Sequence, residues 1–291
     1  MKELVVISGK GGTGKTSIVA AFAALAASKV LADCDVDAAD LHLVLDPNIR
    51  QREVFTGGSV ARIKIEECER CDICRNLCRF DAIDDNFRID EIACEGCGVC
   101  HDACQYGAIE LATKTAGEWY ISETRHGMMV HAKLGIAEEN SGKLVSLVRT
   151  QARKIAAENR LELVIIDGSP GIGCPVIASM TGVDLALAVT EPTLSGIHDL
   201  ERVAGLAKHF GNRLAVCVNK WDINPEMTGR IENWCRREGL AVAGKIAFDP
   251  IVTRAQIAGV SVIEYSSGSA ALEIKKVWRR IAREMELENI A

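Results

Sequence analysis

A glycine-rich segment near the N-terminus constrains the fold of this chain most strongly. Residues 4–8 (LVVIS) form a short apolar run typical of a buried parallel strand, and residues 16–28 (TSIVAAFAALAAS) are alanine-rich and predict a helix. Between them, residues 9–16 read GxxxxGKT. A strand, a glycine-rich turn and a helix in this order surround a phosphate with backbone N–H groups and a helix N-terminus. The segment therefore predicts a nucleotide site at one edge of a parallel sheet.

Each residue type in this motif has an expected task. The Lys15 ammonium should reach the β- and γ-phosphates, and the Thr16 hydroxyl should bind Mg²⁺. The remaining cofactor contacts are expected from Gly11, Gly12, Thr13, Gly14 and Ser17. Lys10 is an additional lysine, which an ordinary phosphate-binding loop does not need.

Five further segments predict strands of the same sheet. They are residues 30–33, 161–167, 185–190, 214–220 and 244–250, the last of them before C-terminal helices. Ligands of such sheets bind at the carboxyl ends of the strands. Acidic or amide residues stand at the carboxyl ends of three of these segments, namely Asp33 with Asp35 and Asp37 just beyond it, then Asp167, and Asn219. We therefore predict an α/β fold with a doubly wound, mostly parallel P-loop NTPase sheet.

Cysteines define a second module. Eight of the twelve lie in CERCDICRNLC (68–78) and CEGCGVCHDAC (94–104), and each segment reads C-x2-C-x2-C-x3-C. Corresponding cysteines differ by a constant 26 residues, which indicates an internal duplication. In a reducing compartment such a density of cysteines indicates metal binding and not disulfides.

This duplication resembles the bacterial two-cluster ferredoxins. The resemblance implies two 4Fe-4S clusters, one held by Cys68, Cys71, Cys74 and Cys104, the other by Cys94, Cys97, Cys100 and Cys78. A pair of zinc sites is the alternative, but zinc motifs usually separate two cysteine pairs by a dozen or more residues. Arg79 and Gln105 stand where a proline commonly follows the fourth cysteine.

Five segments outside the cysteine block carry a second resemblance. KGGTGKT (10–16), the acidic stretch that begins at residue 33, IIDGSPG (165–171), TEPTLSGIHDL (190–200) and VNK (218–220) together resemble the MinD/ParA/Mrp branch of P-loop ATPases, with its deviant Walker A motif. In that family two subunits enclose two ATP molecules, and each inserts its extra lysine against the phosphates bound to the other. The resemblance implies this role for Lys10, and with it an ATP-dependent homodimer or a heterodimer with a related ATPase.

The same resemblance assigns further roles one residue at a time. Lys10, Lys15 and Asp35 are the catalytic residues, with Asp35 orienting the attacking water. Asp167 matches the Walker B acid and Asp33 is expected to help hold the metal, while Asn219 would contact the base. Asp37 has no counterpart and is expected to be a solvated loop acid. The string VNKWD (218–222) also resembles the guanine-reading NKxD motif, although the family favours ATP.

The charge distribution supports an inserted domain. Residues 60–112 hold 6 Lys/Arg and 12 Asp/Glu, and the rest of the chain holds 28 of each, so the formal net charge of −6 lies in this interval. We predict a MinD-like ATPase domain at 1–59 and 113–291, and a small α+β ferredoxin domain at 60–112. An acidic domain of this kind favours a redox or metallocluster partner with a basic patch.

Three functions are compatible with this combination. ATP-dependent dimerisation could be coupled to ferredoxin-type electron transfer, the ATPase could serve metallocluster assembly or maturation, or it could position or regulate partners with clusters that sense redox state. The negative net charge and 4% aromatic content disfavour nucleic-acid binding. With no signal-peptide pattern and no membrane-length apolar run, a cytoplasmic protein without stable membrane insertion is expected.

Three features outside these motifs have simple expected explanations. The amphipathic segment 271–287 predicts a packed terminal helix in preference to a membrane-binding one. The segment Asn140–Lys143 predicts a helix cap. The four remaining cysteines, Cys34, Cys174, Cys217 and Cys235, are expected to be core or loop thiols.

Overall fold

The computed structural model describes residues 1–135 and 141–287, and these divide into two compact units. Unit 1 comprises Met1–Glu53, Trp119–Lys133 and the chain from Ser141 onward. Unit 2 comprises Val54–Glu118 together with Leu134 and Gly135. The interval 60–112 lies within unit 2, which extends beyond it at both ends.

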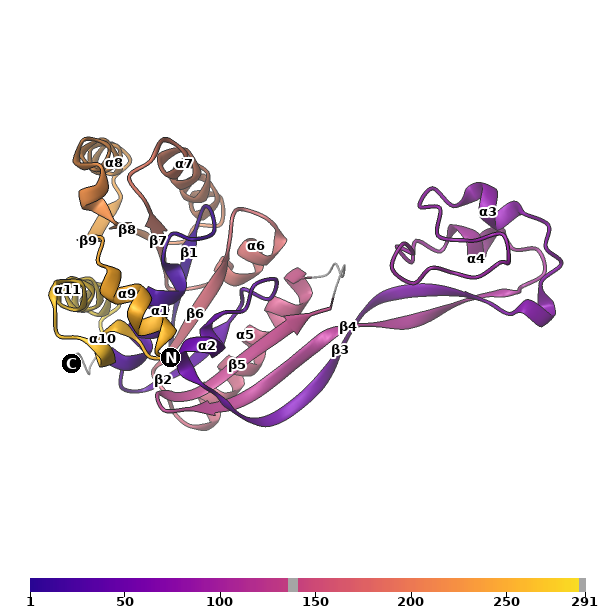
Figure 1. Cartoon of the computed structure of the whole chain (residues 1–291), viewed down its shortest axis with the longest axis horizontal. Helices are drawn as coiled ribbons and strands as arrows, with labels where there is room; N and C mark the ends of the chain where they lie inside the picture. Colours follow the sequence, from indigo (N-terminus) through magenta and orange to yellow (C-terminus); the bar gives the residue numbers. More distant parts are fainter. Residues whose placement is uncertain (136–140, 288–291) are drawn as a thin grey trace. The chain divides into compact units, whose positions relative to one another are not determined.

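The strands of the described chain form one nine-stranded sheet, in the order β3-β4-β5-β2-β6-β1-β7-β8-β9 (Figure 1). Neighbouring strands pair in parallel from β5 through β2, β6, β1, β7 and β8 to β9. The mostly parallel α/β sheet predicted from the sequence is therefore confirmed. The strand bounds are β1 Lys2–Ser8, β2 Lys29–Asp33, β3 Asn48–Ile63, β4 Ile109–Thr124, β5 Gly127–Leu134, β6 Leu163–Pro170, β7 Leu185–Thr190, β8 Leu214–Asn219 and β9 Ala241–Ile246.

Eleven α-helices accompany the sheet within the described residues. They are α1 Lys15–Leu25, α2 Leu41–Leu45, α3 Ile73–Leu77, α4 Val99–Ala103, α5 Ser141–Glu158, α6 Cys174–Met180, α7 Leu194–His209, α8 Pro225–Arg237, α9 Pro250–Ile257, α10 Val262–Tyr265 and α11 Ser269–Glu284. None of these helices is long and apolar enough to cross a bilayer.

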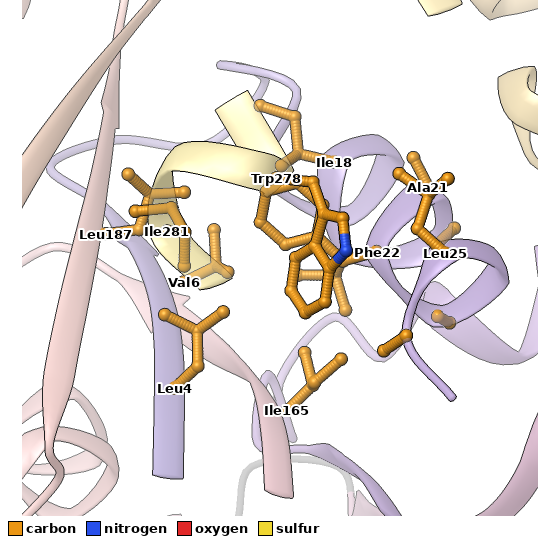
Figure 2. Close-up of a cluster of buried hydrophobic side chains, with 14 of the residues drawn as sticks. Leu4, Val6, Ile18, Ala21, Phe22, Leu25, Ile165, Leu187, Trp278 and Ile281 are labelled. Carbon is orange, nitrogen blue, oxygen red and sulfur yellow. The ribbon is translucent and has the colours of Figure 1, made fainter. Parts of the chain in front are cut away.

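The central strands of unit 1 carry apolar side chains on both faces of the sheet, because helices cover both faces. Leu4 and Val6 of β1 pack into one cluster with α1 and α11 (Figure 2). Val5 and Ile7 alternate with them, point to the opposite face and are also fully buried. Helices α5 and α6 contact the sheet at β2 and β6. A parallel sheet covered by helices on both faces is the doubly wound arrangement.

The terminal helix packs as the sequence predicts. The apolar residues of α11 lie in the same core cluster, and the Trp278 ring is tilted against Phe22 of α1 with 5.0 Å between centroids (Figure 2). The last strand differs from its prediction at 244–250, because it runs from Ala241 to Ile246. The residues predicted to end this strand begin a helix instead. Asp249 caps α9 by accepting a hydrogen bond from the Ile251 N–H at 3.0 Å.

Unit 2 has a small core of its own. Its buried residues are Ala61, Cys74, Ile83, Phe87 and Ile109, and several cysteines pack against them. Gly96 has φ +62°, and a Cβ there would lie 2.0 Å from the Ser59 carbonyl oxygen. Only glycine fits at this position within the second cysteine segment.

Candidate functional site

The glycine-rich loop takes the geometry that a phosphate cradle needs. Helix α1 begins at Lys15, and its N-cap residue Gly14 has φ +89°. A Cβ at Gly14 would lie 2.4 Å from Nδ2 of Asn219. The Asn219 amide donates to the Thr13 carbonyl oxygen at 2.7 Å, so the end of β8 braces the loop. The backbone N–H groups at the start of α1 are thereby held ready for an anion.

Three carboxylates surround the Lys15 ammonium. Asp33 and Asp167 are register partners on the neighbouring strands β2 and β6. Nζ of Lys15 bonds Oδ1 of Asp167 and lies 3.2 Å from Oδ2 of Asp35. The same ammonium lies 3.4 Å from the Thr16 hydroxyl. The fold thus brings together Lys15, the neighbouring acids Asp33 and Asp35, and Asp167, which lies more than a hundred residues further along the chain.

Burial makes this cluster electrostatically unusual. Burial and the neighbouring Asp167 raise the pKa of Asp33 well above its ordinary value, against the opposing effect of Lys15. Burial also raises the pKa of Asp35, although Lys15 acts against it. Burial alone would lower the pKa of Lys15, but the Asp167 and Asp35 carboxylates outweigh it and raise that pKa. The site has more carboxylate than one ammonium can compensate.

Several polar atoms in this region are buried without a hydrogen-bond partner among the described residues. They include one carboxylate oxygen, Oδ2, of both Asp33 and Asp167, and the Thr13 hydroxyl. Buried polar atoms are normally paired. Unpaired carboxylate oxygens of this kind are ligands that a hard cation prefers.

Lys10 differs from Lys15 in its surroundings. Its ammonium lies 3.2 Å from the Ser195 hydroxyl and 3.5 Å from a carboxylate oxygen of Glu191. Glu191 also binds Lys220, whose ammonium donates to the Gly12 carbonyl oxygen at 3.2 Å. Lys10 is about one-third exposed and does not line the cavity beside the loop. The Lys10 side chain is therefore partly open to solvent outside the cavity.

A cavity of about 610 Å³ adjoins the loop. The predicted residues that line it are Gly11, Gly12, Thr13, Gly14, Lys15, Thr16, Ser17, Asp35 and Asn219. Its other walls, including Leu43 and Val44 of α2, the segment 246–249, and Val252, Thr253 and Gln256 of α9, were not predicted. No motif marks these residues, because a cavity wall of ordinary side chains is defined only once distant segments have packed together.

Unit 2 contains two small hollows lined by cysteines. Cys68, Cys71, Cys74 and Cys104 line one, and Cys78, Cys94, Cys97 and Cys100 line the other. Each hollow thus takes three cysteines from one segment and one from the other. Within the described part of the chain, no three His, Cys, Asp or Glu residues are grouped to hold a single metal ion.

The remaining residues from the sequence analysis lie elsewhere. Asp37 and Lys143 are exposed, and Asn140 lies outside the described residues. Cys34, Cys217 and Cys235 are buried, whereas Cys174 is exposed. Burial raises the pKa of the three buried thiols. None of these four cysteines lines either of the two hollows.

Comparison with known proteins agrees with this geometry. Residues 4–262 match a family described as the CobQ/CobB/MinD/ParA nucleotide binding domain. The uncharacterized protein MJ0578 of Methanocaldococcus jannaschii is 39% identical over 226 residues, which cover 76% of this chain and 79% of that protein.

Two solved structures share the fold at lower identity. The septum site-determining protein MinD of Pyrococcus horikoshii, complexed with Mg-ADP, is 16% identical with a TM-score of 0.61, covering 99% of this chain and 98% of that one. MinD in the MinC:MinD cell division complex of Aquifex aeolicus is 18% identical with a TM-score of 0.60, covering 100% and 98%.

Proposed function

This chain belongs to the CobQ/CobB/MinD/ParA family of nucleotide-binding domains, and we propose that it is an ATP-hydrolysing iron–sulfur protein. In this proposal, ATP-dependent dimerisation of unit 1 is coupled to ferredoxin-type electron transfer by clusters in unit 2. The observation that carries it is the presence in one chain of a lysine–carboxylate nucleotide site and two four-cysteine hollows.

The cavity favours ATP over GTP. Asn219 and Lys220 line it, but Asp222, the acid of the guanine-reading NKxD pattern, does not. The Asp222 carboxylate instead accepts a hydrogen bond from the Phe248 N–H at 2.6 Å. Because this bond holds the loop after β9, the aspartate is engaged in structure and not in reading a base.

The acidic cluster fits Mg²⁺. Asp33 and Asp167 offer buried oxygens without partners, and the Thr16 hydroxyl lies near the same ammonium. Hard cations prefer such oxygen ligands, and one or two carboxylates together with substrate phosphates suit Mg²⁺. Asp33, Asp167 and Thr16 would hold the ion, which would neutralise phosphate charge when bound.

Nucleotide binding would then rearrange the partners of Lys15. Its ammonium bridges Asp167 and Asp35 in the structure described here. Turning toward the phosphates would release the Asp35 carboxylate into the cavity that it already lines. A free carboxylate at this position can orient the attacking water, whereas one paired with Lys15 cannot.

Lys10 would act on a second subunit. Lys10 does not line the cavity of its own chain, and its ammonium contacts within the described residues are a 3.5 Å ion pair and one hydroxyl. Partly exposed ion pairs contribute about 0.2–1 kcal/mol. Detaching Lys10 to reach a partner's phosphates therefore costs little, and positive charge there stabilises the transition state.

The two hollows fit 4Fe-4S clusters. Each provides four thiol groups, the ligand set that such clusters require. Each thiolate would bind a different iron atom of such a cluster, so the four cysteines need not converge on one point as the ligands of a single metal ion do. The clusters, when bound, supply one-electron redox chemistry, and the cysteines of unit 2 hold them.

Metal analysis of anaerobically purified protein tests cluster binding. We expect about eight iron atoms per chain, four for each cluster, with equal acid-labile sulfide. Cys71→Ser and Cys97→Ser should each damage a different cluster, and Cys174→Ser, which changes an exposed cysteine of unit 1, should leave iron content unchanged. One or two zinc ions without sulfide would overturn the iron–sulfur assignment.

An EPR-monitored redox titration with and without Mg-ATP tests the coupling. A shift of about 60 mV in a one-electron couple corresponds to a tenfold change in equilibrium. Wild type should show a nucleotide-dependent shift, and Lys15→Ala, which should not bind nucleotide, should show none. Coincident curves for wild type, with ATP hydrolysis intact, would remove thermodynamic coupling and favour a role in cluster assembly or docking.

A further inference from the structure

The turn between β4 and β5 carries Arg125, whose guanidinium contacts three residues from other elements. Arg125 Nε lies 2.6 Å from one Glu264 oxygen, and Nη2 lies 3.1 Å from the other. Nη2 also donates to the Val44 carbonyl oxygen at 2.7 Å, and it lies 3.3 Å from the Gly259 carbonyl oxygen. We call these residues the Arg125 clamp.

One partner of Arg125 lines the nucleotide cavity, and the other two follow a helix that lines it. Val44 lies on α2 and lines the cavity directly. Gly259 and Glu264 follow α9, whose residues Val252, Thr253 and Gln256 line the cavity as well. Gln256 also donates to the Ser17 hydroxyl of α1 at 2.8 Å. The clamp therefore ties the cavity-lining helix α2 to the segment that directly follows the cavity-lining helix α9.

The same clamp lies close in sequence to the unit 1 ends of two strands that lead to unit 2, β3 and β4. Only Asp46 and Pro47 separate α2 from β3, which enters unit 2 at Val54. Strand β4 leaves unit 2 after Glu118 and ends at Thr124, directly before Arg125. These two strands are hydrogen-bonded neighbours in the sheet. A change in the distance between α2 and the end of β4 would therefore shift β3 relative to β4.

We propose that Arg125 is a positioning residue that transmits the nucleotide state of the cavity to β3 and β4, and so to the cysteines of unit 2. This inference rests on the proposed function, since it names the element that couples the two sites. It adds a route that the family's nucleotide motif does not contain, because β4 and its turn lie outside that motif.

The bonds of the clamp differ in strength in a way that makes it a switch. The ionised guanidinium donates in every case, but Glu264 is a charged acceptor that binds through both carboxylate oxygens, whereas Val44 offers a single bond to a neutral carbonyl oxygen. When nucleotide displaces α2, the bond to Val44 breaks first and Arg125 stays on Glu264. The clamp thus has two states, with β3 either tied to the β4–β5 turn through α2 or released from it.

Hydrogen exchange of β3 and β4 with and without Mg-ATP tests this inference without relying on the clusters. Couplings between sites typically change an equilibrium by about fivefold or more. In wild type we expect nucleotide to change exchange in residues 54–63 and 109–118 by at least about that factor. Arg125→Lys keeps the charge but loses the planar fork, and it should abolish this change while retaining ATP binding.

A matched control lies on the same strands. Arg50 of β3 pairs with Glu123 of β4 at the surface and touches no cavity wall in the described structure. Arg50→Lys should leave the nucleotide response intact. Glu264→Gln weakens the clamp from its other side and should reproduce Arg125→Lys, which guards against a folding defect specific to one variant.

The outcomes separate the inference from the function on which it rests. A wild-type response that persists in both Arg125→Lys and Glu264→Gln would refute the clamp while leaving ATP-coupled redox chemistry intact. The absence of any response in wild type, with ATP bound, would refute the coupling itself. Loss of the response in Arg50→Lys as well would assign it to strand pairing in general and overturn the specific role of Arg125.

Discussion

Replacing Lys15 by methionine should destabilise the protein in a strongly pH-dependent way, even without nucleotide. The side chain is 6% exposed, and its ammonium is bonded to the Asp167 and Asp35 carboxylates. Removing one partner of a buried ion pair costs about 3–5 kcal/mol, because the remaining charge loses its counter-ion but stays buried. We expect a loss of this size near pH 7.

The pH dependence follows from proton linkage. Without Lys15, the cluster should retain one proton more in the native state than in wild type, while unfolded aspartates are ionised above about pH 4. A native state that binds more protons than the unfolded state loses stability as pH rises, by about 1.4 kcal/mol per pH unit for each proton. From pH 5 to pH 7 the variant should therefore lose about 3 kcal/mol more than wild type does.

Urea unfolding in EDTA at several pH values measures this difference. Lys29→Met is the matched control, since Lys29 is also buried but its ammonium donates to the Ala26 carbonyl oxygen at 2.7 Å and to no carboxylate described here. Its stability should not fall toward pH 7 relative to wild type. Parallel curves for Lys15→Met and wild type, or a loss under about 1 kcal/mol at pH 7, would contradict the electrostatic account.

Three other outcomes follow from the structure. Lys10→Ala should keep nucleotide affinity, because Lys10 does not line the cavity, but it should lose ATP-dependent dimerisation and most turnover. Calorimetry measures the affinity and light scattering measures the dimerisation. Normal dimerisation of the variant would contradict the action of Lys10 on a second subunit. Burial and the neighbouring His42 lower the pKa of His131 to about 4. Native stability should therefore fall by about 3 kcal/mol as the pH drops from about 6.5 toward 4, and His131→Gln should flatten this dependence in urea titrations. Trp278→Ala should cost about 3–5 kcal/mol in thermal or urea unfolding, because the ring is 1% exposed in the main core; a loss under 1 kcal/mol would mean that α11 is not part of the cooperative unit.

Local patterns were sufficient for much of the fold. Buried parallel strands are continuous apolar runs, so β1, β2, β6, β7 and β8 can be recognised without knowing what covers them. The long strands β3 and β4 were not predicted. The first seven residues of β3 are exposed, and β4 mixes buried, half-buried and exposed residues, so neither strand has a continuous apolar signal. The end of β9 was misplaced because Asp249-Pro250 begins a helix and not a strand end.

The residues that provide the chemically active groups could be recognised from the sequence. The GxxxxGKT loop, the repeated cysteine spacing and the acids after strands are short-range features, because a turn or a cluster tripod is built by neighbouring residues. These features are enough to predict phosphate binding and two cysteine ligand sets, including Lys10 as an extra cation.

The contacts between these side chains are established by the tertiary structure. Asp33, Asp35 and Asp167 converge on Lys15 because β2 and β6 are neighbours in the sheet, although more than a hundred residues separate them in the chain. The walls of the cavity at α2 and α9, and the Arg125 clamp that joins them, consist of residue types without a motif. Side-chain chemistry is a local property of the sequence, but proximity depends on the packing of the whole chain, so contacts of this kind have no signature until the fold exists.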